Sequence, residues 1–263
     1  MNILEKIIAQ KRVEVAARKA AIPIATLEGY PDFKKVSYSL KQALRDETKT
    51  GIIAEFKRAS PSKGNINVTA QVEIVTADYT KGGASGVSVL TDENFFKGSL
   101  HDLAVAIKNV VPVLRKDFMI DTYQLVEAKA YGASVVLLIA ACLSPIEVKK
   151  LAGDAKKLGL EVLLELHDET ELEHICTEVD LVGINNRNLK TFSVDLEQSI
   201  RLAGKIGSHF LKIAESGINS AADVVFLKQQ GFDGFLIGER FMKEKDPGVA
   251  FKTFVSELKL ITL

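Results

Sequence analysis

The chain has 263 residues but no tryptophan and only two cysteines, Cys142 and Cys176. The two cysteines form no closely spaced pair of the kind that redox and metal sites use, and such scarcity is typical of proteins kept in a reducing compartment. We expect both thiols to serve as small apolar packing groups. The sequence therefore predicts a cytoplasmic protein without a disulfide framework.

The sequence also lacks a net charge and a long apolar run. Lysine plus arginine total 34, and aspartate plus glutamate total 34, whereas nucleic-acid binding needs a basic excess or patch. No run of about 18 apolar residues is present, as a membrane span would require. The N-terminal residues mix charges among the apolar side chains and lack the apolar core of a signal peptide. Nucleic acid and membrane are therefore not expected partners.

Short apolar runs recur along the chain and alternate with amphipathic segments. Apolar strands without polar alternation are covered on both faces, which is typical of a parallel sheet with helices on its surface. Eight such units predict an α/β fold, a (β/α)8 TIM barrel. An open, doubly wound sheet is the alternative, but it usually carries a G-x-G-x-x-G loop, which is absent here. The predicted strands are 52–57, 86–90, 112–117, 134–139, 161–165, 181–185, 211–215 and 234–238.

The segments between these runs carry helix signals. Asp121 is a candidate N-cap, and Ser144 followed by Pro145 is a typical helix start. Paired glycines at 82–83 end one of the helices. The predicted helices are 69–81, 100–109, 121–131, one beginning at Ser144, 219–230 and 246–258.

The residues ahead of the first strand predict a helical extension. An apolar stripe with helical spacing comes first, prolines at 23 and 31 interrupt the next stretch, and a second short helix is expected around Leu40 and Leu44. This part has too few apolar residues for a core of its own. We expect a single domain, with an N-terminal helical extension at 1–48 and the barrel at 49–263. The stripe consists of Ile3, Leu4, Ile7, Ile8, Val13 and Val15.

Polar residues gather where the predicted strands end, which is where barrel enzymes place their chemistry. Glu55 and Lys57 share one face of the first strand, and Phe56 takes the other. That pair alone is explained by a strand-end ion pair, but charges from several strands converging on one mouth predict an active site. Among the neighbours, His167 is expected to pack or to support a residue of the site from behind, Asp117 to cap or pair structurally, and Glu239 to lie at the rim. The other strand-end residues are Lys116, Glu165, Asn185, Arg187, Glu215 and Ser216.

Glycine-containing turns come after the last two predicted strands. They are Ser216-Gly217-Ile218 and Gly238-Glu239. Many barrels bind phosphate here, through backbone N–H groups and a helix N-terminus. Glycine permits the close approach of an anion. These two turns therefore predict a phosphate site.

Several of these segments resemble the motifs of indole-3-glycerol phosphate synthases. The resemblance covers nearly the whole chain, including the N-terminal extension, and its first motif is highly specific. One departure is Glu239, because members of the family often have a small residue near the phosphate. A carboxylate that pointed inward would repel phosphate, so we expect Glu239 to point away. The matching segments are 53–64, 90–92, 95–99, 114–118, 165–169, 183–189, 214–218 and 236–238.

The resemblance implies the ring closure of 1-(2-carboxyphenylamino)-1-deoxyribulose 5-phosphate to indole-3-glycerol phosphate, carbon dioxide and water. It implies Lys116 as the general acid and Glu165 as the base, with Lys57 assisting as an acid or holding the aryl carboxylate. Glu55 and Asn185 would orient these groups. No metal or cofactor is implied, and the sequence contains no ligand cluster for one.

The resemblance also implies the residues that surround the substrate. Arg187 offers a planar fork for a carboxylate. The aromatic ring would be enclosed by Phe96, Phe118, Leu138 and Leu189. The phosphate and its neighbouring hydroxyl groups would be bound by Ser60, Ser216, Gly217 and Gly238, with Ser216 also counted among the catalytic residues.

Two other functions remain open at this point. One is a different phosphosugar enzyme, such as an isomerase or an aldolase that forms a Schiff base on Lys116. The other is a barrel that only binds a phosphorylated ligand, which the full set of acids and amines argues against. In each case the expected partner is a small phosphorylated molecule. We expect a monomer, with at most weak association with other enzymes of tryptophan biosynthesis.

Overall fold

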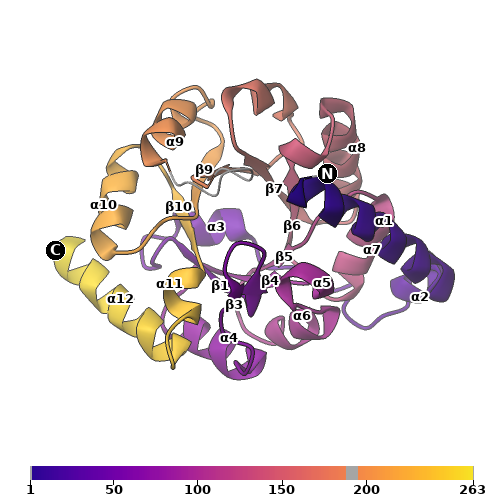
Figure 1. Ribbon diagram of the computed structural model, residues 1–263, viewed down its shortest axis with the longest axis horizontal. Coiled ribbons are helices and arrows are strands. Elements are labelled where there is room, and N and C mark those ends of the chain that lie inside the picture. Colours follow the sequence, from indigo (N-terminus) through magenta and orange to yellow (C-terminus); the bar gives the residue numbers. More distant parts are fainter. Residues whose placement is uncertain (1, 188–194, 263) are drawn as a thin grey trace.

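The structure is a computed structural model that describes residues 2–187 and 195–262. Eight parallel strands close into a barrel in the order β1-β4-β5-β6-β7-β8-β9-β10, and β10 pairs with β1. Helices surround the barrel (Figure 1). The predicted (β/α)8 fold is therefore confirmed, and the open sheet is excluded.

The barrel strands differ from the predicted ranges only at their ends. A short antiparallel hairpin, β2 (Ala59–Ser60) with β3 (Gly64–Asn65), is inserted after the first barrel strand, in the segment where turn residues were noted. The barrel strands are β1 (Ile52–Phe56), β4 (Gly86–Leu90), β5 (Val113–Lys116), β6 (Val135–Ile139), β7 (Glu161–Leu166), β8 (Leu181–Asn185), β9 (Leu211–Glu215) and β10 (Gly234–Ile237).

The helices include all those that the sequence predicted. Asp121 accepts from the backbone N–H of Tyr123 and Ser144 from that of Glu147, so both predicted caps are confirmed. Among the described residues, no helix combines the length and the apolar character needed to cross a bilayer. The helices are α1 (Ile3–Ala21), α2 (Ile24–Glu28), α3 (Leu40–Arg45), α4 (Val72–Lys81), α5 (Glu93–Phe96), α6 (Leu100–Ala106), α7 (Thr122–Ala130), η1 (Ala140–Cys142), α8 (Pro145–Lys157), η2 (Glu169–His174), α9 (Leu196–Ala203), α10 (Ala221–Gln229), α11 (Glu239–Met242) and α12 (Pro247–Thr262).

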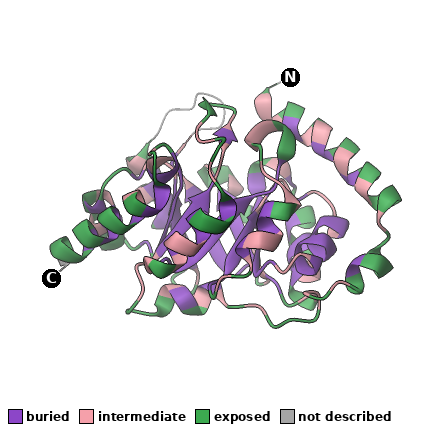
Figure 2. Cartoon of the chain, turned by 90° about the horizontal axis from the view of Figure 1, so that it is seen from below, coloured by how far each residue is buried: buried purple, intermediate pink, exposed green. Residues whose placement is uncertain are grey.

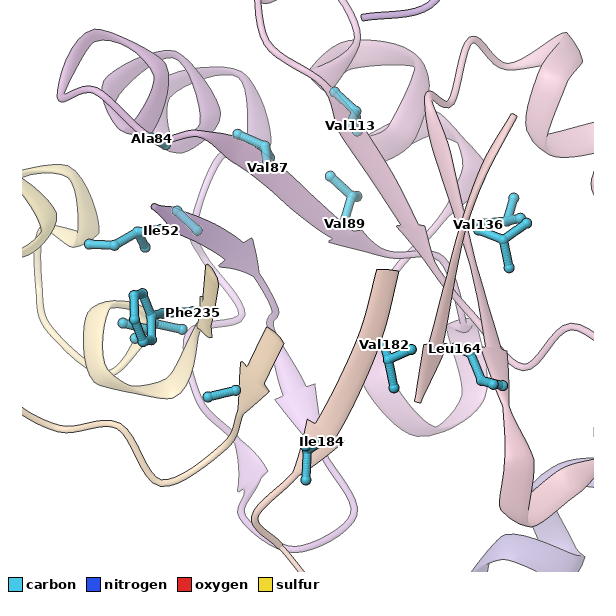
Figure 3. Packing of buried hydrophobic residues seen from close by; sticks show 14 of the residues in the cluster. Ile52, Ala84, Val87, Val89, Val113, Val136, Leu164, Val182, Ile184 and Phe235 are labelled. Carbon is cyan, nitrogen blue, oxygen red and sulfur yellow. The ribbon is translucent and has the colours of Figure 1, made fainter. Parts of the chain in front are cut away.

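The apolar core has two layers, one on each side of the strands. Outward-facing side chains such as Val87 and Val136 pack against the helices (Figure 3). Leu137 and Ile139 of β6 point into the barrel and belong to the inner cluster. Leu138, between them, is fully buried in the outer cluster. The prediction that Leu138 encloses a ligand is therefore wrong, because successive strand residues face opposite sides of the sheet.

The amino-terminal end of the barrel is closed by α3. Leu40 of α3 belongs to the inner cluster, together with Leu114 and Leu163 of the strands. Glu161 at the start of β7 accepts from the backbone N–H groups of Leu40 and Lys41 at 2.8 and 3.1 Å. A carboxylate at a helix N-terminus satisfies free N–H groups and the positive end of the dipole. The closed floor leaves the carboxyl end as the open end of the barrel.

Helix α1 is anchored to the barrel by a buried lysine. Lys11 Nζ lies 2.8 Å from Asp92 Oδ2 and 2.9 Å from Asp117 Oδ1, and the lysine side chain is 0% exposed. Burial alone would raise the pKa of Asp117, but Lys11 and Arg115 hold it at about 2. The expectation that Asp117 pairs structurally is thus confirmed, and its partner comes from the extension.

The buried face of α1 differs from the apolar stripe read from the sequence. Its buried residues are Ile7, Lys11 and Val15, whereas Val13 is 64% exposed. These positions recur at intervals of four, as expected for one face of a helix. A lysine occupies the middle position because the carboxylates beneath it neutralise its charge.

Replacing Lys11 with methionine tests the anchoring of α1. Lys11→Met leaves the buried Asp92 and Asp117 carboxylates without their shared cation, which costs about 3–5 kcal/mol for a buried pair. We expect a loss of that size in the free energy of unfolding, measured by urea denaturation followed by circular dichroism. The control Lys6→Met changes an exposed residue of the same helix and should shift stability by no more than about 0.5 kcal/mol. Equal stability of the two variants would contradict the anchoring role.

Candidate active site

A cavity of about 490 Å³ opens at the carboxyl ends of the strands. Its size is in the usual range for small-molecule sites. The N-terminal end of α1 and the β2–β3 hairpin lie at this end of the barrel (Figure 2). Most of the predicted site residues line it: Glu55, Lys57, Ser60, Phe96, Lys116, Phe118, Glu165, Asn185, Arg187, Ser216, Gly217 and Gly238.

Side chains from several strands meet in one ionic cluster at the base of the cavity. Lys116 Nζ at the end of β5 donates to Glu165 Oε2 on β7 and to Glu215 Oε2 on β9, each at 2.7 Å. Asn185 Nδ2 of β8 donates to the other oxygen of Glu165 at 2.9 Å. The side chains of Lys116, Glu165 and Glu215 are 13%, 4% and 2% exposed. Solvent therefore screens these charges only weakly.

The protonation states of the cluster result from burial and mutual contact. Burial alone would lower the pKa of Lys116, but Glu165 and Glu215 raise it above its usual value. Burial would raise the pKa of Glu165, but Lys116, and after it His167, hold it well below its usual value. Burial raises the pKa of Glu215 to about 7 despite the opposing effect of Lys116. At neutral pH Lys116 is thus an ammonium and Glu165 is ionised, whereas Glu215 is only partly ionised.

A second acid–amine pair lies at the carboxyl end of β1, as the sequence predicted. Lys57 Nζ lies 2.6 Å from Glu55 Oε1. A Cβ atom on Gly238 would come within 2.7 Å of the same Glu55 oxygen, and one on Gly183 would collide with Glu215 Oε1. Glycine at these two positions leaves room for the two carboxylates.

At the mouth of the cavity lies the Glu239 carboxylate, which was expected to point outward. Glu239 lines the cavity, and its two oxygens lie 3.3 Å from Lys63 Nζ and 3.3 Å from Arg187 Nη2. The expectation that Glu239 points away is therefore wrong. Two cations offset its charge, so it can face the cavity without being exposed as a lone anion.

The turns after β9 and β10 border the same cavity. Ser216 and Gly217 both have left-handed backbone angles, with φ of +66° and +73°. This conformation is strained for serine and is often found at functional sites. Asn186 Nδ2 holds the turn by donating to the Ser216 carbonyl at 2.7 Å. Ser216, Gly217 and Gly238 are thus brought together, as the sequence predicted.

The apolar wall of the cavity is partly the predicted one. The rings of Phe96 and Phe118 lie with their centroids 6.1 Å apart. Leu137 and Ile139 take the place that Leu138 was expected to fill. Leu189 lies outside the described residues.

The cavity residues without a predicted role include Glu215 and three residues of α1. Glu215 was recognised as a strand-end residue but was given no role. Its position at the end of its predicted strand, which matches that of Glu165, was a usable signal. Helix α1 contributes Ile3, Leu4 and Ile7, and no pattern in the extension indicates which barrel face it covers. The described residues contain no group of His, Cys, Asp and Glu suited to hold a metal ion.

Solved structures share this fold at low sequence identity. The alpha subunit of tryptophan synthase from Legionella pneumophila has a TM-score of 0.61 at 14% identity, over 84% of this chain and 95% of its own. Thiamine phosphate pyrophosphorylase from Pyrococcus furiosus has a TM-score of 0.60 at 14% identity, over 85% and 99%. At this level of identity the likeness concerns the barrel fold alone.

Sequence relatives are much closer and share one name. A protein of Bacteroides thetaiotaomicron named indole-3-glycerol phosphate synthase is 49% identical over 259 residues, which cover 98% of this chain and 99% of that protein. One of the same name from Polaromonas sp. is 44% identical over 95% of this chain and 96% of its own. A family model described as indole-3-glycerol phosphate synthase matches residues 4–254. The resemblance seen in the motifs is thereby confirmed, and the chain belongs to the indole-3-glycerol phosphate synthase family.

Proposed function

We propose that this member of the family is a decarboxylating lyase of tryptophan biosynthesis, which converts 1-(2-carboxyphenylamino)-1-deoxyribulose 5-phosphate to indole-3-glycerol phosphate. The observation that carries the assignment of roles is the Lys116 ammonium held by Glu165 and Glu215 in the cavity. Ring closure needs an acid beside the ketone, and the later loss of a proton needs a base. The cluster contains both groups in direct contact, the Lys116 ammonium as the acid and the Glu165 carboxylate as the base.

The substrate has three parts that match three regions of the cavity. The phosphate would meet the turns at Ser216-Gly217 and Gly238, where backbone N–H groups can face an anion. The aromatic ring would lie against Phe96 and Phe118. The ribulose chain would then cross the ionic cluster between these two ends.

The first step joins the aryl carbon to the ketone carbon. Lys116 donates its proton to the carbonyl oxygen as the new bond forms, so that a hydroxyl group results instead of an alkoxide. Lys57, whose ammonium lies beside Glu55, would hold the aryl carboxylate by charge or assist as a second acid. The carboxylate then leaves as carbon dioxide, and its bonding electrons restore the aromatic ring.

The last step removes the hydroxyl group as water and a proton from the neighbouring carbon. Glu165 accepts that proton, since Lys116 and His167 keep its pKa low and the carboxylate therefore ionised at neutral pH. The ketone oxygen gains two protons in all, one of which is balanced by the proton lost from carbon. The reaction thus takes up one proton from solvent for each carbon dioxide released from a substrate carboxylate.

The state of Lys116 also bears on the rival aldolase mechanism. A Schiff base requires a neutral amine, whereas the neighbouring Glu165 and Glu215 raise the pKa of Lys116 and so favour its ammonium form. This supports a role for Lys116 as a proton donor, and not as the nucleophile that forms a Schiff base. A barrel that only binds ligand would have no need of an acid and a base in direct contact.

The assignment is tested by adding the anilino-deoxyribulose phosphate and monitoring indole absorbance. We expect product with the wild type and a fall in kcat of at least about a hundredfold in Lys116→Met, because the acid is lost. Lys116→Arg keeps a cation beside Glu165 and Glu215 but cannot donate its proton usefully, so it should be similarly slow. Unchanged kcat in either folded variant would contradict the role of Lys116, and no product with the wild type would contradict the function.

A substitution in the turn after β9 tests the phosphate site. Gly217→Asp places a charge at the expected anion position, so it should weaken substrate binding and abolish the rise in melting temperature caused by inorganic phosphate. Gly231→Asp is the matched control, because Gly231 also has a positive φ, +86°, and a Cβ there meets nothing within 4 Å. Equal protection of both variants by phosphate would show that the anion binds elsewhere.

The role of Glu165 is tested by Glu165→Gln, which keeps the shape of the side chain and removes the base. Turnover should fall by about two to four orders of magnitude while binding is retained. Because the block falls after decarboxylation, carbon dioxide should appear in a burst without matching indole product. Equal loss of both signals would instead indicate that Glu165 acts only by holding the lysine in place.

A further inference from the structure

The ring of His167 lies behind Glu165, between two carboxylates. His167 Nε2 lies 3.1 Å from Glu165 Oε1, and Nδ1 lies 3.6 Å from Glu171 Oε2 at the start of η2. The His167 side chain is 11% exposed. As far as the described residues define the cavity, Glu165 lines it and His167 does not. His167 therefore acts on the reaction only through its neighbours, and among those that the structure describes Glu165 is the one that lines the cavity.

The geometry around the ring favours the charged form. A neutral imidazole has one nitrogen with a lone pair, which would face a carboxylate here, whereas an imidazolium presents N–H groups to both. Neither nitrogen makes an aligned hydrogen bond, so the contacts act mainly through charge. Burial alone would lower the pKa of His167, but Glu165 and Glu171 raise it to about 10.

The surroundings hold this residue in place. The backbone N–H of His167 donates to Glu171 Oε2 at 2.6 Å, and Gln198 of α9 donates to the His167 carbonyl at 3.3 Å. The other ionisable groups near Glu165 include Lys116, which contacts its other carboxylate oxygen, and Glu215, which contacts the same Lys116 ammonium. The Cys142 thiol of η1 is neutral, because burial and the nearby Glu165 raise its pKa to about 12.

We propose that His167 is a positioning residue, whose imidazolium fixes the Glu165 carboxylate from behind and keeps it ionised until it accepts the proton in the last step. This rests on the proposed role of Glu165 as the base. Lys116 loses its positive charge when it gives its proton to the substrate, and Glu165 then loses its principal cationic neighbour. His167 does not line the cavity that the described residues form and gives no proton to the substrate, so its charge still faces Glu165 at that stage.

The first test compares the pH dependence of His167→Gln with that of the wild type. Loss of the imidazolium raises the pKa of Glu165, so the acid limb of kcat/KM should move upward by about one pH unit. At neutral pH, where Glu165 is ionised in both proteins, kcat should fall about tenfold with little change in KM, because the carboxylate is no longer held in place. His209→Gln, an exposed control, should leave both unchanged. Superimposable profiles for His167→Gln and the wild type would overturn the proposal.

A second test examines the wild-type protein directly and does not depend on a variant's activity. The chain has four histidines, whose ring nitrogens can be observed by nitrogen-15 NMR across a pH titration. The imidazole whose signals are missing from the spectrum of His167→Gln should remain doubly protonated at pH 8. Assignment of the His167 ring as neutral at that pH would overturn the proposal.

A double-variant cycle separates this proposal from the function of Glu165. If His167 acts through the base, adding His167→Gln to Glu165→Gln should cause no further loss of kcat, because the two effects are not independent. A further tenfold loss in the double variant would refute the positioning role and leave the base intact. An active Glu165→Gln would instead refute the base itself.

Discussion

Side-chain alternation along closely paired parallel strands decides which residues of this chain can reach the cavity. In a closed barrel each strand residue faces either the helices or the interior. The interior is filled by aliphatic side chains such as Leu114 and Leu163, so a charge is tolerated only where the strand ends. Lys116, Glu165 and Glu215 occupy such positions on different strands. Their convergence is a consequence of strand register as much as of local sequence.

The same constraint explains why the ionic groups influence one another so strongly. Each is largely removed from water, and each therefore depends on its neighbours for charge compensation. Lys116 is neutralised by two carboxylates, and one of these, Glu165, is shared with Asn185 and faced by His167. A substitution at any member changes the electrostatic environment of the others. Double variants therefore reveal more about the role of each residue than single variants do.

Much of this arrangement could be predicted from the sequence, because the barrel has strong local signals. The apolar runs predicted the strands, and the polar residues at the strand ends identified Lys116 and Glu165 as site residues. Leu138 was assigned to the cavity wall from the family resemblance, and the apolar run 135–139 has no polar alternation that would show which of its residues face the interior. The very short helices α5 and α11 have too few residues for a helical period to appear.

Other features depend on contacts between distant segments and have no local signature. The burial of Lys11 requires Asp92 and Asp117, which are far away in the chain. The inward position of Glu239 requires Lys63 and Arg187 to be nearby in space. Glu215 was predicted in part: its place at the end of a strand was evident from the sequence, but its contact with Lys116 was not. Sequence reasoning was thus most reliable for backbone elements and least reliable for charge pairing.

The position of α1 has a practical consequence for handling the enzyme. Ile3 and Leu4 line the cavity, so an affinity tag or fusion partner joined ahead of them would emerge beside the substrate entrance. The C-terminal helix α12 lies on the outer ring and ends well away from that opening (Figures 1 and 2). Immobilisation on a resin or attachment of a fluorophore is therefore better made at the C-terminal end.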